Sequence, residues 1–206
     1  MSDQLLDFSG LVAVVTGGSR GLGREMSLAM AARGADIVIT SRKADACEAV
    51  AKEIEAMGRQ AMAYGCHVGH WEEVRAMIDS VYDRFGKIDI LINNAGMSPL
   101  YDKLSDVPEA LFDKVIDVNL KGPFRAMAYA GEKMAASGGG SIVNISSTAS
   151  LHPSPNAAAY GAAKAGLNSL TQSFAHALGP TVRVNCIAAG PFLTDISKAW
   201  DLEAFE

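Results

Sequence analysis

The sequence predicts a doubly wound α/β domain, in which helices cover both faces of a parallel sheet. Six short apolar runs recur along the 206 residues, and amphipathic segments separate them. The runs are hydrophobic at consecutive positions, which is typical of strands buried on both faces. Because strand and helix alternate, we expect three layers, α/β/α, in a single domain over residues 1–206.

The expected strands follow the apolar runs in order. They are LVAVVTG from Leu11, ADIVIT from Ala35, AMAYGCHV from Ala61, IDILINN from Ile88, SIVNIS from Ser141 and TVRVNCI from Thr181. Residues 44–57 and 72–85 carry apolar side chains every three or four positions with charged residues opposite, which predicts helices. The glycine runs at 17–23 and 138–140 punctuate these elements, so no linker or domain boundary is expected.

Composition and charge exclude several classes of protein. The net charge of −5 is spread without a basic stripe, so neither nucleic acid nor an anionic membrane is an expected partner. No stretch reaches the roughly 18 apolar residues of a membrane span, and we expect a cytoplasmic location. Cys47, Cys66 and Cys186 lack disulfide or zinc spacing, so they are predicted to be buried small hydrophobic residues and no metal is expected.

A glycine-rich turn follows the first strand. The turn TGGSRGLG, Thr16–Gly23, leads directly into the helical segment REMSLAMAARG. Such a turn lets the backbone approach a phosphate closely, while the helix N-terminus binds the negative charge. Gly17, Gly21 and Gly23 are the candidates for this approach. An ordinary tight turn is the alternative.

The end of the second strand indicates which dinucleotide the chain binds. An acidic residue there usually binds the adenosine ribose hydroxyls, whereas a 2′-phosphate requires a cation. This chain has Ser41 and Arg42 at that point, and Arg20 lies in the glycine turn. We therefore expect NADP(H) to be preferred over NAD(H). The alternative is that both arginines are solvated surface residues.

These motifs, in this order, resemble the short-chain dehydrogenase/reductase family. TGGSRGLG is followed by NNAG at 93–96, VNL at 118–120, and a serine, tyrosine and lysine at Ser147, Tyr160 and Lys164. The chain looks similar to the 3-oxoacyl-(acyl-carrier-protein) reductase and gluconate 5-dehydrogenase branches. The resemblance implies a Rossmann-like fold, an oxidoreductase acting on a small-molecule ketone or secondary alcohol, and a homodimer or homotetramer. The expected cofactor-binding residues are Gly17, Ser19, Arg20, Gly21, Leu22, Gly23, Ser41, Arg42, His67, Val68, Asn94, Ala95, Gly96, Tyr160, Lys164, Gly190, Pro191 and Thr194.

The spacing of Tyr160 and Lys164 carries a chemical argument. Lowering a tyrosine pKa from about 10 by about 3 units requires about 4 kcal/mol of preferential phenolate stabilisation. The two residues lie four apart in a helical stretch, so both project from one face and the ammonium can supply much of that energy. By resemblance, Tyr160 is the general acid or base, Lys164 lowers its pKa and holds the ribose, and Ser147 binds the substrate oxygen. Ser146 faces the other way if the strand continues.

Asn119 matches the family's fourth catalytic residue. Pro123 has no amide hydrogen, so if VNLKGPF is helical the Asn119 carbonyl loses its usual donor and is free to hold water. In the family, such a water connects the lysine to solvent. The alternative is a helix that starts after Pro123.

Three features depart from the family pattern. His67 stands where an aspartate usually reads the adenine amino group, and we expect it either to accept that hydrogen bond when neutral or to lie on the surface. Ala189 replaces the proline that usually precedes Gly190. The chain ends at KAWDLEAFE, so the family's C-terminal lid and last strand are expected to be truncated, and the sequence does not identify the substrate.

The rival hypothesis is a binding protein of the same fold that senses NADP without turnover. The shortened lid favours it, whereas the intact serine, tyrosine and lysine argue against it, because a sensor has no need of them. In either case the loop before Tyr160 is expected to line a pocket through His152, Pro153 and Asn156.

Overall fold

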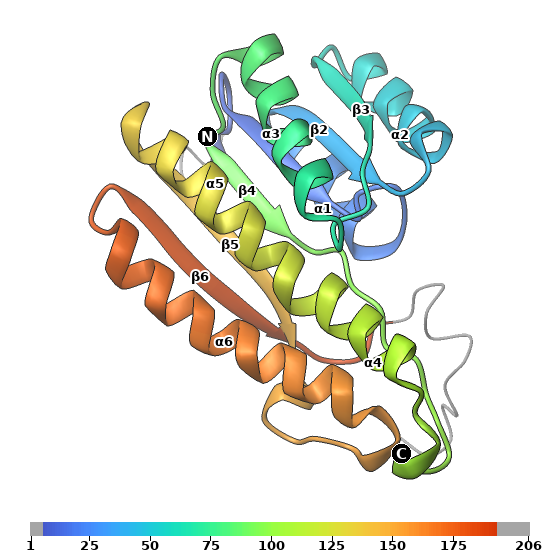
Figure 1. Cartoon of the computed structure of the whole chain (residues 1–206). Coiled ribbons are helices and arrows are strands. Elements are labelled where there is room, and N and C mark those ends of the chain that lie inside the picture. The colour runs from blue at the N-terminus through green and yellow to red at the C-terminus, as the bar shows by residue number, and fades with distance from the viewer. Residues whose placement is uncertain (1–5, 193–206) are drawn as a thin grey trace.

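The computed structural model describes residues 6–192, in which six parallel strands form one sheet with helices on both faces (Figure 1). The predicted α/β/α fold is therefore confirmed. Each strand coincides with one of the predicted apolar runs. The strands are β1 (Val12–Thr16), β2 (Asp36–Ser41), β3 (Ala61–Gly65), β4 (Ile90–Asn93), β5 (Gly140–Ser147) and β6 (Val182–Ala189).

In the described part of the chain, six α-helices connect and cover the strands. The expected helices over 44–57 and 72–85 correspond to the second and third of them. The third is amphipathic, and its buried residues recur at three- and four-residue spacing from Val74 to Val81. The helices are α1 (Gly21–Ala31), α2 (Ala44–Ala56), α3 (Trp71–Phe85), α4 (Glu109–Ile116), α5 (Gly122–Ala136) and α6 (Ala158–Leu178).

The strand order is β3-β2-β1-β4-β5-β6. The chain begins in the middle of the sheet at β1, builds outward through β2 and β3, and then returns to pair β4 with the free edge of β1. Val14 consequently pairs with Val38 on one side and Leu91 on the other. The connections that follow β1 and β4 leave in opposite directions, which opens a crevice at the carboxyl ends of these strands, the usual ligand site of such sheets.

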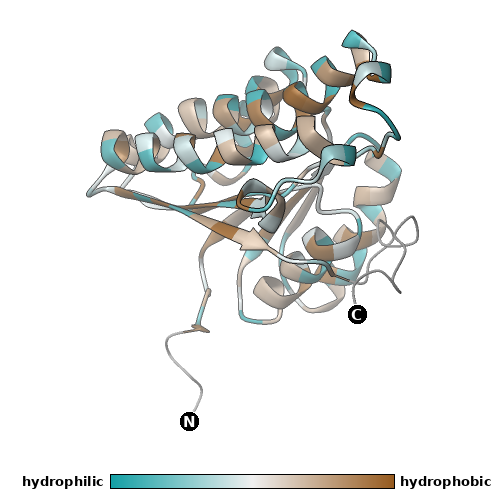
Figure 2. Cartoon of the chain, turned by 90° about the horizontal axis from the view of Figure 1, so that it is seen from below, coloured by the Kyte–Doolittle hydropathy of each residue, from teal (hydrophilic) through white to brown (hydrophobic). Residues whose placement is uncertain are grey.

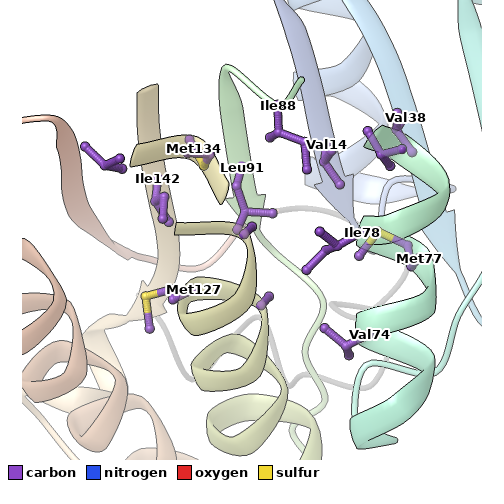
Figure 3. Close-up of a cluster of buried hydrophobic side chains, with 14 of the residues drawn as sticks. Val14, Val38, Val74, Met77, Ile78, Ile88, Leu91, Met127, Met134 and Ile142 are labelled. Carbon is purple, nitrogen blue, oxygen red and sulfur yellow. The ribbon is translucent and has the colours of Figure 1, made fainter. Parts of the chain in front are cut away.

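Alternate side chains of the strands enter two separate cores. Val12 and Val14 point into a core shared with α3, α5 and α6, whereas Ala13 and Val15 point into one shared with α1 and α2. Figure 2 shows the sheet between its two layers of helices. This double burial explains why the strands are apolar at consecutive positions. Figure 3 shows the first core, where Val14, Val38, Ile88, Leu91 and Ile142 meet Val74, Met77, Ile78, Met127 and Met134 of α3 and α5.

The prediction of buried, hydrophobic cysteines is right for two of the three. Cys47 and Cys66 are buried, and burial raises the pKa of the Cys66 thiol to about 12, so little thiolate forms at neutral pH. Cys186 is only half-buried, because β6 is an edge strand of the described sheet. Its thiol lies 3.3 Å from Asn168 Oδ1 and donates a hydrogen bond to it, so a purely hydrophobic role is wrong at this position.

Residues 6–192 contain neither a membrane-spanning helix nor a grouped set of metal ligands. None of the helices there is long and apolar enough to cross a bilayer. No three side chains of His, Cys, Asp or Glu are grouped there so as to hold a metal ion.

Candidate active site

The turn after β1 is shaped by its glycines. Gly17 has φ +67° and Gly21 φ +52°, in the left-handed region that side chains disfavour. A Cβ on Gly23 would lie 2.3 Å from the Gly17 carbonyl oxygen, so the first turn of α1, which includes Leu22, packs directly against the turn that contains Ser19. α1 has no side-chain cap and no acidic residue in its first turn. Its N-terminal amides and positive dipole end are therefore available to an anion.

The loop after β4 is fastened to this turn by Asn94. Asn94 Nδ2 donates to the carbonyls of Thr16 at 3.0 Å and Gly17 at 3.3 Å. Thr16 Oγ1 in turn accepts from the amides of Asn94 at 3.0 Å and Ala95 at 3.1 Å. Thr16 was not among the expected site residues; the signal for it is a hydroxyl at the end of an otherwise apolar strand.

The residues expected at the adenosine end lie on the rim of the crevice. Arg20 precedes α1 in extended backbone and is exposed. Ser41 ends β2 half-buried, and Arg42 beside it is exposed. Among the ion pairs within residues 6–192, neither arginine has a carboxylate partner. Ser41 Oγ donates to the Lys43 carbonyl at 3.1 Å, so it would have to turn to donate to a phosphate.

His67 is held in a turn after β3. Its Nδ1 accepts a hydrogen bond from the Gly69 amide at 3.2 Å, and its ring stacks on His70 with centroids 4.3 Å apart. Burial, together with the charges of His70 and Arg42, lowers the pKa of His67, so the ring is neutral at pH 7. With Nδ1 accepting, the ring proton lies on Nε2. In this arrangement the remaining nitrogen is a donor, so accepting from the adenine amino group requires Nδ1 to release the Gly69 amide. The contact with adenine stays a prediction.

Lys164 is a buried cation. Its side chain belongs to a residue only 4% exposed, and Nζ donates to the Ile145 carbonyl at 2.6 Å. Burial lowers the pKa of Lys164 to about 8, which still leaves most of the amine protonated at pH 7. Nζ lies 5.7 Å from the centroid of the Tyr160 ring. The predicted proximity of these two side chains is confirmed.

Tyr160 differs from expectation in its pKa. Burial raises the pKa of the phenol, and a hydrogen bond with Ser147 opposes this rise without cancelling it. The expected net lowering of this pKa is therefore wrong for this geometry, because desolvation of the phenolate outweighs the hydrogen bond from Ser147. A phenol with a raised pKa is neutral at pH 7 and carries the proton that a general acid has to donate.

Ser147 ends β5, and its hydroxyl is oriented by the next turn. Ser147 Oγ accepts from the Ala149 amide at 3.1 Å, which leaves its single proton to be donated. Ser146 is buried and donates to the Lys164 carbonyl at 3.2 Å. Because β5 continues through both serines, the prediction that they face opposite ways is confirmed, and Ser147 is the one that meets Tyr160.

Asn119 is fully buried and anchors the loop that follows β4. Its Nδ2 donates to the carbonyls of Met97 and Val115, both at 2.9 Å, and its Oδ1 accepts from the Met97 amide at 3.2 Å. A Cβ on Gly96 would lie 3.0 Å from Asn119 Oδ1 and 3.6 Å from Lys164 Nζ. The loop thus passes between two of the residues expected to be catalytic.

The helical run around Asn119 is not regular. α4 passes through a π-helical segment, Asp117–Lys121, into α5, and the Gly122 amide donates to the Asp117 carbonyl five residues back. Pro123 lies at the start of α5, four residues after Asn119. In a regular α-helix the amide at that position would donate to the Asn119 carbonyl, but proline has no amide hydrogen. The helical interpretation of VNLKGPF is confirmed, and the alternative of a helix starting after Pro123 is wrong.

The π-helical segment brings a further expected residue against α5. A Cβ on Gly122 would lie 2.4 Å from the Val68 carbonyl oxygen, so the loop after β3 packs on the start of α5 through its backbone. After β6, Gly190 and Pro191 are exposed. Thr194 lies outside the described residues.

The loops after β4 and β5 meet at the start of α6. Tyr101, which was not expected in the site, donates its amide to the Asn156 carbonyl at 3.2 Å, and its hydroxyl accepts from the Ala159 amide at 3.1 Å. The phenol thereby caps a helix that has no other side-chain cap. His152, Pro153 and Asn156 are exposed in this region.

Comparison with known proteins gives a consistent picture. The sequence model for short chain dehydrogenases matches residues 11–204. The dehydrogenase/reductase SDR family member 4 of Bos taurus is 36% identical over 192 residues, which is 92% of this chain and 69% of the relative. The 3-oxoacyl-(acyl-carrier-protein) reductase FabG of Staphylococcus aureus is 38% identical over 189 residues, 91% of this chain and 76% of the relative.

Solved structures agree with these sequence relatives. A short-chain alcohol dehydrogenase from Sinorhizobium meliloti has a TM-score of 0.92 at 37% identity, covering 97% of this chain and 80% of that one. A 7α-hydroxysteroid dehydrogenase complexed with NADH and 7-oxo glycochenodeoxycholic acid has a TM-score of 0.89 at 35% identity. The match covers 94% of this chain and 75% of that one. A metagenomic short-chain oxidoreductase in complex with NADP has a TM-score of 0.85 at 38% identity. The match covers 89% of this chain and 83% of that one.

Proposed function

The chain belongs to the short-chain dehydrogenase family of oxidoreductases, and we propose that it transfers a hydride between NADP(H) and a ketone or secondary alcohol. The grouping of Tyr160, Ser147 and Lys164 at the end of β5 carries the proposal. Ser147 lies close enough to the Tyr160 hydroxyl to oppose the rise in its pKa, and the Lys164 ammonium lies 5.7 Å from the centroid of the phenol ring. Burying an ammonium costs stability, so a buried lysine beside a phenol supports a chemical role for the pair.

The crevice fits a nicotinamide dinucleotide. The left-handed backbone of Gly17 and the uncapped N-terminus of α1 suit a pyrophosphate. Lys164 Nζ, beside Gly96, is suited to the nicotinamide ribose hydroxyls. When bound, the nicotinamide supplies or accepts the hydride.

The protein residues handle the proton and the charge of the carbonyl oxygen. In reduction, Tyr160 donates its phenolic proton to the substrate oxygen, and its raised pKa keeps that proton in place at neutral pH. Ser147 donates a hydrogen bond to the same oxygen, because its acceptor side is occupied by the Ala149 amide. The Lys164 ammonium stabilises the phenolate that remains. Alcohol oxidation reverses these transfers.

The preference for NADP(H) rests on Arg20, Ser41 and Arg42. β2 ends without a carboxylate that would bind ribose hydroxyls, and the two guanidinium groups have no carboxylate partner within residues 6–192. Related structures hold NADP in one case and NADH in another. Fluorescence titration should show tighter binding of NADPH than of NADH, and Arg42→Ala should weaken NADPH binding by about tenfold while leaving NADH unchanged. Equal or tighter binding of NADH to the wild type would contradict this preference.

NADPH oxidation against a panel of β-ketoesters, sugars and ketosteroids tests the activity. We expect turnover with at least one substrate, and a loss of about 100-fold or more in kcat for Tyr160→Phe with unchanged NADPH binding. Tight NADPH binding without oxidation on any substrate would instead favour the NADP-sensing protein.

A further inference from the structure

A chain of hydrogen bonds behind Ser147 crosses three elements of the fold. Ser150, in the 3-10 turn after β5, donates from Oγ to the Ser147 carbonyl at 2.6 Å. Asn168 of α6 donates from Nδ2 to Ser150 Oγ at 2.9 Å. Cys186 of β6 donates from Sγ to Asn168 Oδ1 at 3.3 Å. The turn that carries the serine is thereby tied to the helix that carries the proposed acid.

Proton counting fixes the direction of every bond in this chain. A serine hydroxyl has one proton, and the 2.6 Å contact with the Ser147 carbonyl uses that of Ser150. Ser150 is therefore restricted to accepting from Asn168, which turns the amide nitrogen toward Ser150 and the amide oxygen toward the thiol of Cys186. An aspartate at 168 has no proton to donate and would compete for that of Ser150.

Helical spacing explains how Asn168 reaches the site. Tyr160, Lys164 and Asn168 stand at positions i, i+4 and i+8 of α6, so they form one stripe on the helix. Because Tyr160 and Lys164 both lie on α6, the helix itself fixes their separation. Ser147 ends β5, which Ser146 and Lys164 already tie to α6. The direction of the Ser147 hydroxyl depends in addition on the turn after β5, because the Ala149 amide of that turn donates to it.

We propose that Asn168 is a positioning residue, which braces Ser150 against α6 and so holds the Ser147 hydroxyl where it meets the substrate oxygen. The task of Ser147 rests on the proposed function, whereas the brace itself rests on the hydrogen bonds alone. Asn168 acts through Ser150 and does not contact the substrate.

Kinetics of Asn168→Ala and Asn168→Asp test the proposal. Because small displacements of a catalytic group cost up to about 100-fold, we expect kcat to fall by about 10- to 100-fold in both variants, with KM and NADPH affinity unchanged. Gln172→Ala removes an amide from an exposed position of the same helix and should leave kcat unchanged. Cys186→Ser keeps a hydrogen-bond donor to Asn168 and should also leave kcat unchanged. Wild-type kcat in both Asn168 variants would overturn the proposal.

A double-mutant cycle separates positioning from general destabilisation. In a Ser147→Ala background there is no hydroxyl left to position, so adding Asn168→Ala should not lower the residual kcat further. An equal fold-loss in both backgrounds would show a merely structural role and overturn the proposal.

Hydrogen exchange tests the brace without any turnover. Asn168→Ala should speed amide exchange over residues 147–151 and leave residues 160–164 unchanged. Ser150→Ala removes the same brace from its other side and should give the same result if Asn168→Ala does not fold. If the wild type reduces no substrate, the proposed function fails. The exchange experiment still tests whether Asn168 braces Ser150, because it does not depend on turnover. Unchanged exchange over 147–151 would overturn the brace.

Discussion

The ammonium of Lys164 lies where water does not solvate it. Its residue is 4% exposed, and Nζ donates to a single backbone carbonyl, that of Ile145. The bond recovers part of the hydration that is lost, and the remaining cost appears as the lowered pKa. Such a cost persists in a fold when the charge has a task, and we propose that the task here is to stabilise the Tyr160 phenolate and bind ribose.

The lowered pKa of Lys164 predicts a pH-dependent stability. Its folded value of about 8 is below the unfolded value, so between about pH 8 and pH 10.5 the unfolded chain binds more protons and stability rises with pH. Lys164→Met lacks this titration. In urea unfolding, the unfolding free energy of the wild type minus that of Lys164→Met should increase by about 2–3 kcal/mol from pH 7 to pH 10. A difference that does not vary with pH would contradict the buried charge.

At the scale of elements, the π-helical segment Asp117–Lys121 joins two helices that have different tasks. α4 receives the Asn119 side chain through Val115, while α5 packs into the core through Met127 and Met134. The wider turn between them lets both contacts coexist, and Pro123 removes the amide that would favour a regular turn.

Pro123→Ala should therefore lower activity without lowering stability. The new amide can bond the Asn119 carbonyl, which withdraws that carbonyl from the water that we propose connects Lys164 to solvent. We expect kcat to fall severalfold and Tm to be unchanged or raised, because alanine is the better helix former. Steady-state kinetics and thermal unfolding check both expectations, and a wild-type kcat would argue against a role for the carbonyl.

Gly23→Ala tests the packing of α1 against the glycine turn. The added Cβ would lie 2.3 Å from the Gly17 carbonyl oxygen and 2.6 Å from Asn94 Nδ2, neither of which is free to move. Overpacking should lower the unfolding free energy by about 1–3 kcal/mol and abolish NADPH binding. Gly65→Ala, whose Cβ would meet Ala44 at an ordinary 3.4 Å, is the control. Undiminished NADPH binding by Gly23→Ala would exclude the turn as a phosphate site.

The sequence predicts these elements well where a local pattern encodes them. Apolar runs predict all six strands: β1 and β2 are buried on both faces, whereas β6 buries alternate residues such as Val182 and Val184. The i, i+4 spacing predicts the approach of Tyr160 and Lys164. Desolvation depends on the whole fold, so the direction of the Tyr160 pKa was not predictable from spacing. The hydrogen-bond partners of Asn168 come from segments 18 residues away on either side, and no local pattern links them.

For the whole molecule, the site lies at the junction of two halves. β1 to β3 with α1 and α2 provide the glycine turn and the arginines, whereas β4 to β6 with α5 and α6 provide the serine, tyrosine and lysine. Asn94 binds across the junction between β4 and β1. We therefore expect cofactor binding to be coupled to the half that carries Ser147, Tyr160 and Lys164, through the loop that Asn94 and Asn119 both contact.

We predict that an aromatic patch on the outer helices mediates association between copies of the chain. We define the patch as Trp71, Phe124 and Phe174. The rings of Trp71 and Phe124 are stacked with centroids 6.1 Å apart, and Phe174 meets Phe124 edge-on with centroids 5.5 Å apart. Trp71 is 39% and Phe124 37% exposed. α5 and α6, which carry the two phenylalanines, run side by side across one face of the sheet (Figure 1). An exposed aromatic group on paired long helices suits a two-fold contact between identical subunits.

Phe124→Glu should therefore disrupt the homo-oligomer that we predict. A carboxylate desolvated against the same face of a second copy is unfavourable, so sedimentation should show a dimer or tetramer for the wild type and a monomer for the variant. Met57→Glu alters a side chain of similar exposure, 46%, at the end of α2 and should leave the oligomer intact. Because association stabilises the folded state by mass action, the Tm of the wild type should rise with protein concentration and that of Phe124→Glu should not. A wild type that sediments as a monomer at micromolar concentration, with a Tm independent of concentration, would contradict this prediction.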